Sequence, residues 1–243
     1  MEFSVQAYCP ICEDRHEFTS RDDFWSCRDE LKSENCGLGG CITRERALAH
    51  VLFTLSDRES VRHLSIHEAG PMPRGLSAWL TVNAKHYVRS GFYPTIPPGD
   101  FVGEIKNENL EAQTFGNGVF DVVIHLDVME HVFEPFKALN EIHRTLRLGG
   151  YCLFTAPTEH ARFQSEQVAF VENGVVRTVG EAEYHANPQH PEDGALVTWR
   201  YGYDLPLLIQ RNTPFDVEVR RFQARGIAVM GYMNEVYVLR RRI

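Results

Sequence analysis

Apolar residues begin to recur at helical spacing directly after a polar N-terminal segment. Residues 1–43 are rich in charged and turn-forming residues and contain few apolar runs. A segment this short cannot bury a core of its own, so it needs a metal or a disulfide to hold it. From Arg44 onward the pattern predicts a helix over residues 44–55. Its apolar face consists of Ala47, Leu48, Val51, Leu52 and Leu55.

Short apolar segments alternate with helical ones beyond this helix. The pattern predicts a strand at residues 64–67, a helix over 75–82, and strands at 86–89 and 101–105. The clearest strand is Phe120–Leu126. Its nearly continuous apolar run is typical of a sheet that is covered on both faces.

The following segment repeats this alternation of strand and helix. Pro135 suits the first turn of a helix, and apolar residues recur along one helical face from Phe136 to Leu146. Gly149-Gly150 is expected to end this helix, and a strand follows at residues 151–155. Because strands and helices alternate, we predict an α/β fold with a doubly wound, mostly parallel sheet.

The C-terminal part of the chain departs from this rhythm. Two short apolar segments flank Asn173-Gly174, a pair that favours a type I′ hairpin turn. A helix is expected over residues 203–210, and two further strands over 215–222 and 235–239. These two strands are close enough in sequence to pair antiparallel, so the sheet is expected to end on an antiparallel strand.

Composition is that of an ordinary globular protein. Of the 243 residues, 43% are hydrophobic and 11% aromatic, which is ample for a core and argues against disorder. The formal net charge of −8 disfavours nucleic acid as a partner, since that affinity comes from clustered cations. No apolar run approaches the roughly 18 residues of a membrane span. No signal-like segment opens the chain, so a cytoplasmic location without a membrane partner is expected.

Five of the six cysteines lie within the first 41 residues. A Cys-x2-Cys turn can aim two thiolates at one tetrahedral zinc, and a second pair closes the site. We therefore predict a zinc-binding module over residues 1–43, ahead of one domain over residues 44–243. The predicted ligands of this structural Zn²⁺ are Cys9, Cys12, Cys36 and Cys41.

Two other cysteines are expected to play no part in this site. Cys27 is left over in a strand or turn, although it is an alternative to Cys36 or Cys41 as a ligand. Cys152 lies inside an apolar strand and is expected in the core. A disulfide cluster and unrelated free thiols are the alternatives to zinc.

An extended motif begins at the buried strand Phe120–Leu126. It continues as Asp-x-x-Glu-His over residues 127–131, then as a helix whose end reads Arg-x-Leu-x-x-Gly-Gly over residues 144–150. This motif resembles the class I S-adenosylmethionine-dependent methyltransferases, and the similarity extends over most of residues 62–240. The resemblance implies a Rossmann-like sheet and S-adenosylmethionine as cofactor. With its cysteine-rich start, the chain also resembles bacterial zinc-ribbon proteins with a methyltransferase domain.

The same resemblance implies which positions meet the cofactor. These positions lie after the first strand, after the second strand, in the segment that faces the adenine, and after the fourth strand. The matching residues are Glu68, Gly70, Pro71, Ser90, Glu108, Asn109, Leu110 and Asp127. Two positions depart from the family pattern. Met72 stands where a second glycine is expected, and Arg89-Ser90-Gly91 carries no carboxylate for the ribose hydroxyls.

Methyl transfer to a hydroxyl or amine benefits from a general base, usually His, Asp or Glu. In the resembling fold the acceptor site commonly follows the fifth strand, where this chain gathers polar residues. They are His160, Tyr184, His185, Asn187 and His190. We predict His185 or His131 as the base.

These observations predict an S-adenosylmethionine-dependent methyltransferase that acts on a small molecule. A sugar hydroxyl in a glycan or natural-product pathway is the candidate acceptor. One alternative is a methyltransferase-like binding protein without turnover, which the two departures from the family pattern favour. The other is a protein or nucleic-acid methyltransferase recruited by the zinc module, which the acidic charge disfavours.

Overall fold

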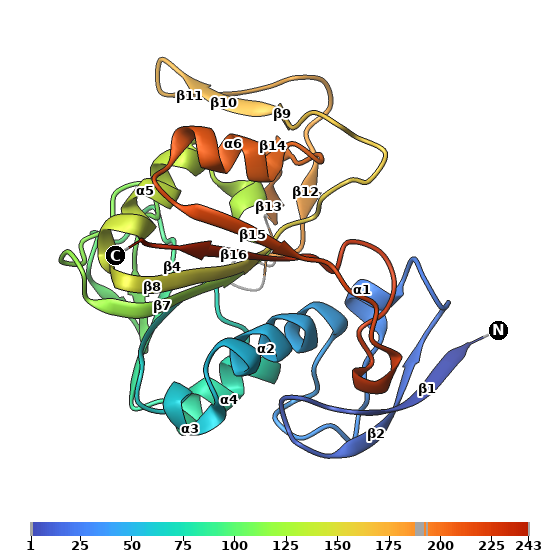
Figure 1. Ribbon diagram of the computed structural model, residues 1–243. Coiled ribbons are helices and arrows are strands. Elements are labelled where there is room, and N and C mark those ends of the chain that lie inside the picture. The colour runs from blue at the N-terminus through green and yellow to red at the C-terminus, as the bar shows by residue number, and fades with distance from the viewer. Residues whose placement is uncertain (1, 188–191, 193, 243) are drawn as a thin grey trace.

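A mixed sheet forms the centre of the computed structural model, which describes residues 2–187, 192 and 194–242 (Figure 1). Within these residues the sheet has eight strands in the order β15-β16-β8-β7-β3-β4-β6-β5. Five neighbouring strands run parallel: β8 (Leu146–Thr155), β7 (Phe120–Leu126), β3 (Ser65–Ala69), β4 (His86–Gly91) and β6 (Ile105–Asn107). The edges are antiparallel, with β16 (Val236–Arg240) and β15 (Asp216–Arg220) at one side and β5 (Phe101–Val102) at the other. The predicted doubly wound α/β fold with an antiparallel last strand is confirmed.

Helices cover both faces of this sheet, as Figure 1 shows. One face carries α2 (Thr43–Leu55), α3 (Arg58–Val61) and α4 (Gly75–Asn83), and the other carries α5 (Pro135–Thr145) and α6 (Leu205–Asn212). Successive residues of β7 point to opposite faces, as the period of a strand requires. Val122 and Ile124 pack in the cluster that contains α2 and α4, while Val123 packs in the cluster that contains α5 and α6.

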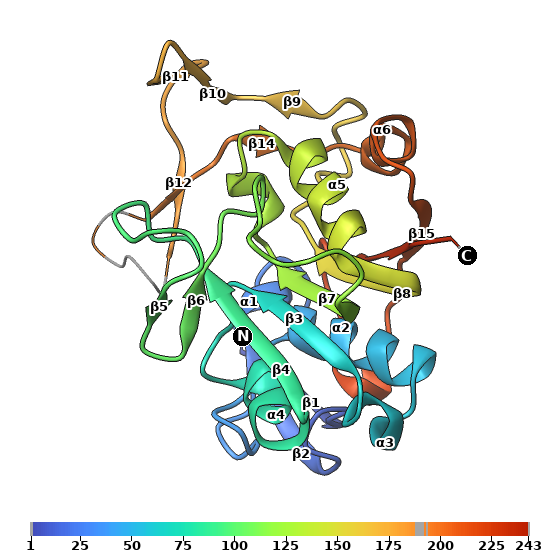
Figure 2. The same ribbon diagram turned by 90° about the vertical axis from the view of Figure 1, so that its left-hand side faces the viewer.

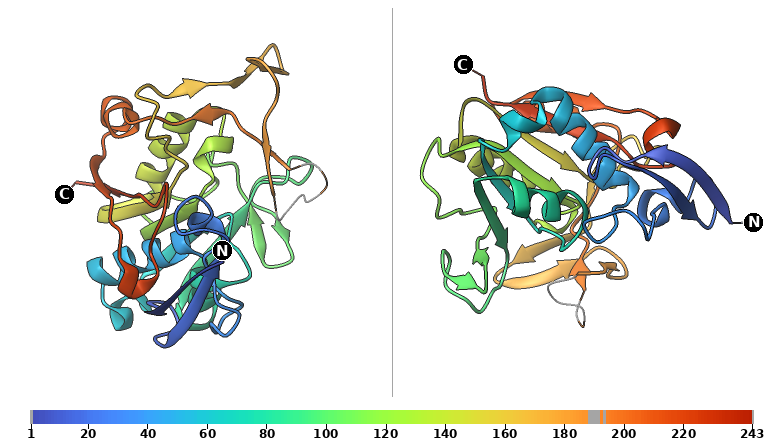
Figure 3. Two further views of the ribbon diagram at one scale, coloured as in Figure 1. Left: turned by 90° about the vertical axis from the view of Figure 1, so that its right-hand side faces the viewer. Right: turned by 90° about the horizontal axis from the view of Figure 1, so that it is seen from below.

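The N-terminal segment forms a hairpin and a short helix beside α2. Its strands β1 (Phe3–Tyr8) and β2 (Arg15–Ser20) pair antiparallel, and α1 (Cys27–Glu30) follows. Buried Phe18 and Leu31 belong to the same apolar cluster as Leu48 of α2 and Val229 near the C-terminus. The views of Figure 3 place this segment against α2 and the C-terminal loop that holds the 3-10 helix η2 (Arg225–Ile227). The first 43 residues therefore share a core with the rest of the chain.

A second group of short strands lies on the side of the sheet that carries α5 and α6 (Figure 1, Figure 2). It consists of β9 (Glu166–Gln167), β10 (Ala169–Glu172), β11 (Val175–Thr178), β12 (Tyr184–His185), β13 (Ala195–Leu196) and β14 (Trp199–Arg200). The predicted hairpin is confirmed, since β10 pairs with β11 and both Asn173 and Gly174 have positive φ. This insertion packs on the 3-10 helix η1 (Met129–His131), whose Glu130 carbonyl accepts a hydrogen bond from the Thr198 amide.

Three details of the sequence prediction were wrong. The strand expected at residues 101–105 is divided into β5 and β6 by a turn in which Gly103 has φ +60°. Helix α5 ends at Thr145 instead of Gly149, and β8 already begins at Leu146. Gly150 allows β8 to lie close to β7, because a Cβ at this position would lie 2.8 Å from the Asp121 carbonyl oxygen of β7. Cys27 starts helix α1 and does not lie in a strand or turn.

None of the helices in the described residues combines the length and the apolar character that crossing a membrane requires.

Candidate functional site

A cleft of about 1400 Å³ opens at the carboxyl ends of β3, β4 and β7. In the sheet, β3 lies between β7 and β4. Helix α4, which follows β3, and helix α5, which follows β7, cover opposite faces. The cleft therefore lies at the topological switch point, the place where open α/β sheets bind ligands. A typical single-ligand pocket measures about 300–1,000 Å³, so this cleft has room for a cofactor and a second small molecule.

Every residue that the sequence singled out for cofactor binding lines this cleft, as do both predicted base histidines. These residues are Glu68, Gly70, Pro71, Ser90, Glu108, Asn109, Leu110, Asp127, His131 and His185. They come from five separate strand ends and loops. The structure brings them together, while their roles toward the cofactor stay predictions.

Glu68, the last but one residue of β3, has a buried carboxyl group. Ser77 of α4 donates a hydrogen bond of 2.7 Å to it, and the Tyr87 hydroxyl donates a second. Burial raises the pKa of Glu68 to about 7, although these two hydrogen bonds oppose the rise. Gly70 follows with φ +69°, and a Cβ there would lie 3.1 Å from Val128 Cγ2. The missing side chain lets a ligand approach the backbone closely, which fits the loop to S-adenosylmethionine.

Two other predicted residues use their polar groups inside the protein. The Ser90 hydroxyl of β4 lies 2.7 Å from Nε2 of buried His67. Glu108, which follows β6, forms an ion pair with Lys106 and accepts a 2.8 Å hydrogen bond from the Thr114 amide. Both side chains are at most 2% exposed. They therefore shape the wall of the cleft through their internal contacts.

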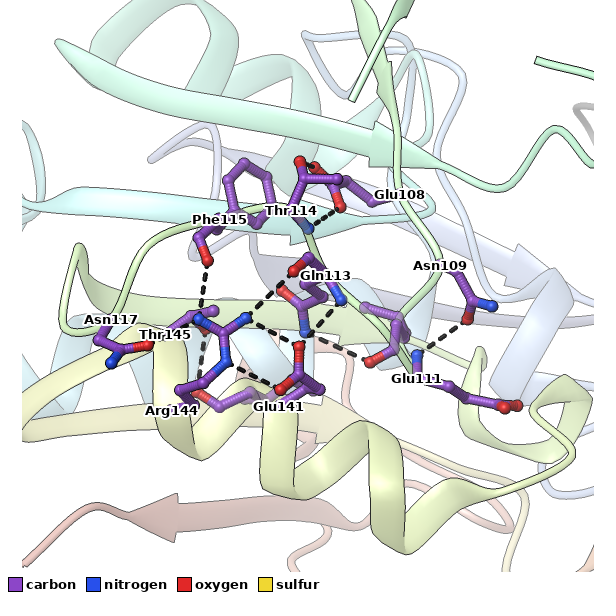
Figure 4. Close-up of polar contacts among 12 residues, drawn as sticks. Glu108, Asn109, Glu111, Gln113, Thr114, Phe115, Asn117, Glu141, Arg144 and Thr145 are labelled. Atoms are coloured by element: carbon purple, nitrogen blue, oxygen red, sulfur yellow. Dashed lines mark hydrogen bonds and ion pairs between the residues drawn. The ribbon is translucent and has the colours of Figure 1, made fainter. Parts of the chain in front are cut away.

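An ion pair on α5 fixes the loop that carries Asn109 and Leu110 (Figure 4). Arg144 donates hydrogen bonds to the carbonyls of Phe115 and Gln113, at 2.7 and 3.1 Å. Its partner Glu141 accepts from the Gln113 amide at 2.9 Å. The Asn109 side chain accepts from the Glu111 amide at 2.9 Å, a local Asx turn. The loop after β6 is thus held to α5 as one unit.

Asp127 directly follows β7 and adopts the left-handed region, with φ +52°. Two arginines from the N-terminal part of the chain reach it: Arg28 at 2.6 Å and Arg44 at 3.1 Å. Thr155 of β8 donates a further hydrogen bond of 2.8 Å. Burial alone would raise the pKa of Asp127, but the two guanidinium groups outweigh it and hold that pKa well below its usual range.

His131, His185 and Asn187 also line the cleft. His131 Nδ1 lies 2.9 Å from the Leu196 carbonyl, and its ring stands perpendicular to that of His185 at 5.1 Å. His160, predicted for the same region, does not line the cleft, and its Nε2 lies 2.6 Å from Glu235 Oε1. Tyr184 is exposed outside the cleft, and His190 lies outside the described residues.

The charged residues of the cleft that sequence reasoning missed include Arg28, Arg44 and Glu130. Glu130 stands inside the Asp-x-x-Glu-His motif, so the motif itself was a signal for it. Nothing local marks the arginines, because Arg28 is 99 residues away from its partner Asp127. They are cleft residues only because the N-terminal segment packs against the sheet.

The four cysteines predicted as zinc ligands lie together at the base of the N-terminal hairpin. Cys36 Sγ is 3.4, 3.5 and 3.3 Å from the sulfurs of Cys12, Cys9 and Cys41, and Cys9 and Cys41 are 3.4 Å apart. Four thiolates around one zinc at about 2.3 Å have their sulfurs roughly 3.8 Å apart, so this cluster fits the ion. All six cysteines are free thiols, and Cys27 instead lies near Ser20 and the Asp22 carbonyl. Cys152 is buried in β8, so its expected place in the core is confirmed.

Comparisons with known proteins agree with this architecture. Residues 85–154 match the family model described as a methyltransferase domain. An S-adenosylmethionine-dependent methyltransferase from Mesorhizobium loti is 14% identical, with 80% of this chain and 98% of that chain covered and a TM-score of 0.50. The 1,6-didemethyltoxoflavin-N1-methyltransferase of Burkholderia thailandensis, with bound 1,6-didemethyltoxoflavin and S-adenosylhomocysteine, is 17% identical over 82% and 79% of the two chains, with a TM-score of 0.45. No curated protein matches the sequence.

The likeness to the Mesorhizobium protein shows that this chain has a methyltransferase fold. The matched domain, which runs from the start of β4 into β8, supports S-adenosylmethionine-dependent methyltransferase activity. Neither comparison defines the methyl acceptor.

Proposed function

We propose that this protein transfers the methyl group of S-adenosylmethionine to a small molecule, and that a sugar hydroxyl is the acceptor. The observation that carries the proposal is the cleft at the switch point, which is lined by the predicted cofactor residues and also by His131 and His185. Its volume of about 1400 Å³ accommodates two small ligands side by side.

In this proposal the loop after β3 and the loop after β6 hold the cofactor. Gly70 offers free backbone, and Asn109 and Leu110 provide the wall for the adenine. Bound S-adenosylmethionine supplies a methyl group on a positively charged sulfur. The protein mainly has to align the acceptor with that methyl group and exclude water. Exposed Trp25, together with Phe92 and Tyr232, lines the cleft with aromatic surface suited to this task.

The acceptor lies in this proposal beside His131 and His185. Both imidazoles line the cleft, and the insertion that contains β12 and β13 packs against η1 beside them. The net charge of −8 disfavours nucleic acid as the acceptor.

Calorimetric titration of the full chain with S-adenosylmethionine and S-adenosylhomocysteine tests the cofactor part. We expect both to bind wild type, and Gly70→Ala to weaken binding more than tenfold because its Cβ enters the cleft wall. Gly226→Ala is the matched control, since a Cβ there meets nothing within 4 Å. If wild type binds neither compound, the proposed enzyme activity is excluded.

Transfer of a labelled methyl group tests the acceptor part. The full chain is incubated with labelled S-adenosylmethionine and, separately, with a panel of sugars and glycosides, with protein, and with RNA. We expect label in the sugar fraction. Label in protein or RNA would contradict the proposed acceptor, and cofactor binding without transfer to any of them would indicate a binding protein without turnover.

We also propose that Cys9, Cys12, Cys36 and Cys41 hold a structural Zn²⁺. Sulfur separations of 3.3–3.5 Å support this set, and buried Arg46 lies 3.6 Å from the Cys41 sulfur, where its charge offsets part of the thiolate charge. Four protein ligands leave no position for a reacting molecule, so the ion would stabilise the hairpin without taking part in methyl transfer.

A further inference from the structure

Glu130 carries a buried carboxyl group that has no role in the proposed methyl transfer. It lies in η1, directly after β7, and is 2% exposed. Among the described residues, neither of its carboxylate oxygens has a hydrogen-bond partner, although Glu130 lines the cleft. Burying an unpaired carboxylate is costly, so this group requires either a proton or a cation.

Two imidazoles lie beside this carboxyl group. His131 Nδ1 lies 2.9 Å from the Leu196 carbonyl, which can only accept, so Nδ1 carries the proton and Nε2 keeps its lone pair. That Nε2 is 3.8 Å from Glu130 Oε1. His185 of β12 completes the group, because one candidate ligand atom from each of the three residues lies within 4.8 Å of the other two.

We propose that Glu130, His131 and His185 form a second metal site, which binds a divalent cation in the cleft, beside the proposed acceptor. Two imidazole nitrogens and one carboxylate are a ligand set for first-row transition metals, and three protein ligands leave coordination positions open. A backbone carbonyl that fixes the tautomer of a liganding histidine, as Leu196 does for His131, is a regular feature of such sites. Unlike the cysteine cluster, this site faces the cleft.

This inference rests on the proposed function and narrows its acceptor. Open positions on the cation would take two neighbouring oxygens, so the preferred acceptor is a vicinal diol of a sugar. A cation held by these residues would lower the pKa of a hydroxyl bound to it, and the released proton would pass to solvent water. The acceptor oxygen then forms the new O–CH₃ bond, and the electron pair of the broken C–S bond stays on sulfur. A liganding nitrogen cannot also accept a proton, so the cation replaces the general base that the sequence predicts.

Metal analysis of the full-length protein tests the site. Protein whose cysteine cluster already holds zinc is equilibrated with Mn²⁺ or, separately, with excess Zn²⁺, and unbound metal is removed. We expect one further metal ion per chain in wild type and a more than tenfold loss of its affinity in His131→Ala and His185→Ala. His63→Ala is the matched control, since His63 is an exposed histidine outside the cleft.

Glu130→Gln provides a second variant that nearly preserves side-chain volume, so it decides the question if a histidine variant fails to fold. S-adenosylmethionine binding is measured on the same samples. If wild type binds the cofactor but takes up no second metal ion from either the Mn²⁺ or the Zn²⁺ solution, the metal site is overturned and the proposed function stands. Retention of the second metal by all three site variants also overturns it. Absence of both cofactor and metal binding overturns both.

Discussion

Glu68 shows how burial at a single residue couples the cleft to pH. Its folded-state pKa of about 7 lies above the ordinary value of 4.5, so the folded chain holds this proton more tightly than the unfolded chain does. The free energy of unfolding therefore decreases as pH rises from about 4.5 to 7, by roughly 3 kcal/mol for a shift of this size. Ionising Glu68 destabilises the fold.

We therefore predict that Glu68→Gln changes the pH dependence of stability. Glutamine cannot ionise, so the variant should gain stability relative to wild type as pH rises from 5 to 8. Thermal unfolding at several pH values measures this difference. Glu59→Gln, which removes an exposed carboxylate, should show no such gain. Parallel curves for Glu68→Gln and wild type would show that Glu68 is not protonated in the folded chain.

Individual residues of the cleft were predictable to different degrees. Gly70 and Asp127 stand at strand ends that the apolar pattern already places, so their arrival at one edge of the sheet follows from topology. The internal contacts of Ser90 and Glu108 could not be predicted from the sequence. Their partners, His67 and Thr114, lie beside them only because of how the chain packs. Sequence spacing predicts the position of a side chain in the fold, but not which of its polar atoms already form hydrogen bonds within the protein.

At the scale of elements, the N-terminal hairpin depends on its cysteine cluster. We predict that Cys36→Ser releases zinc and destabilises the protein, because Cys36 Sγ lies within 3.5 Å of the three other sulfurs. Cys27→Ser should retain the metal, because Cys27 lies apart, beside Ser20. Metal content and thermal unfolding of the two purified variants measure the difference.

The two serine variants also decide between the ligand sets. Loss of zinc from Cys27→Ser, or its retention in Cys36→Ser, would contradict the proposed ligands.

Elements with strong periodic patterns were predicted well, and short connecting ones were not. Strand β7 was expected at its observed bounds, since Phe120–Leu126 is a continuous apolar run. The end of α5 was misjudged because Gly149-Gly150 reads as a helix stop, whereas Gly150 permits close contact with Asp121 of β7. The insertion that carries His185 has few buried residues of its own. Its position over η1 arises from contacts far apart in sequence, such as Thr198 with Glu130.

At the scale of the whole molecule, the N-terminal segment and the cleft are joined through Arg28. Its guanidinium lies 2.6 Å from Asp127 and donates to the Met233 carbonyl at 2.9 Å, and the Arg28 and Asp127 side chains are 10% and 14% exposed. We predict that Arg28→Gln destabilises the fold by about 3 kcal/mol, the scale for breaking a buried ion pair. Urea denaturation measures this loss.

Arg21→Gln is the matched control for this prediction. Arg21 pairs with Glu30 on the same segment, but its side chain is 80% exposed, and exposed pairs contribute at most about 1 kcal/mol. Equal effects of the two variants would show that Arg28 does not hold the segment to the sheet. This coupling was beyond the sequence, because no local pattern pairs Arg28 with Asp127, which lies 99 positions further along the chain.

The contact between Arg28 and Met233 also has a consequence for the newly synthesised chain. The two residues are 205 positions apart, and ribosomes add about 5–20 residues per second, so the hairpin exists for roughly 10–40 s before its docking partner is made. During translation, apolar residues such as Phe18 and Leu31 have not yet met the C-terminal loop that later covers them. A metal ion bound by the nascent hairpin would stabilise its fold before the hairpin packs against the rest of the chain. Metal scarcity during synthesis would instead prolong the exposure of this surface to chaperones and proteases.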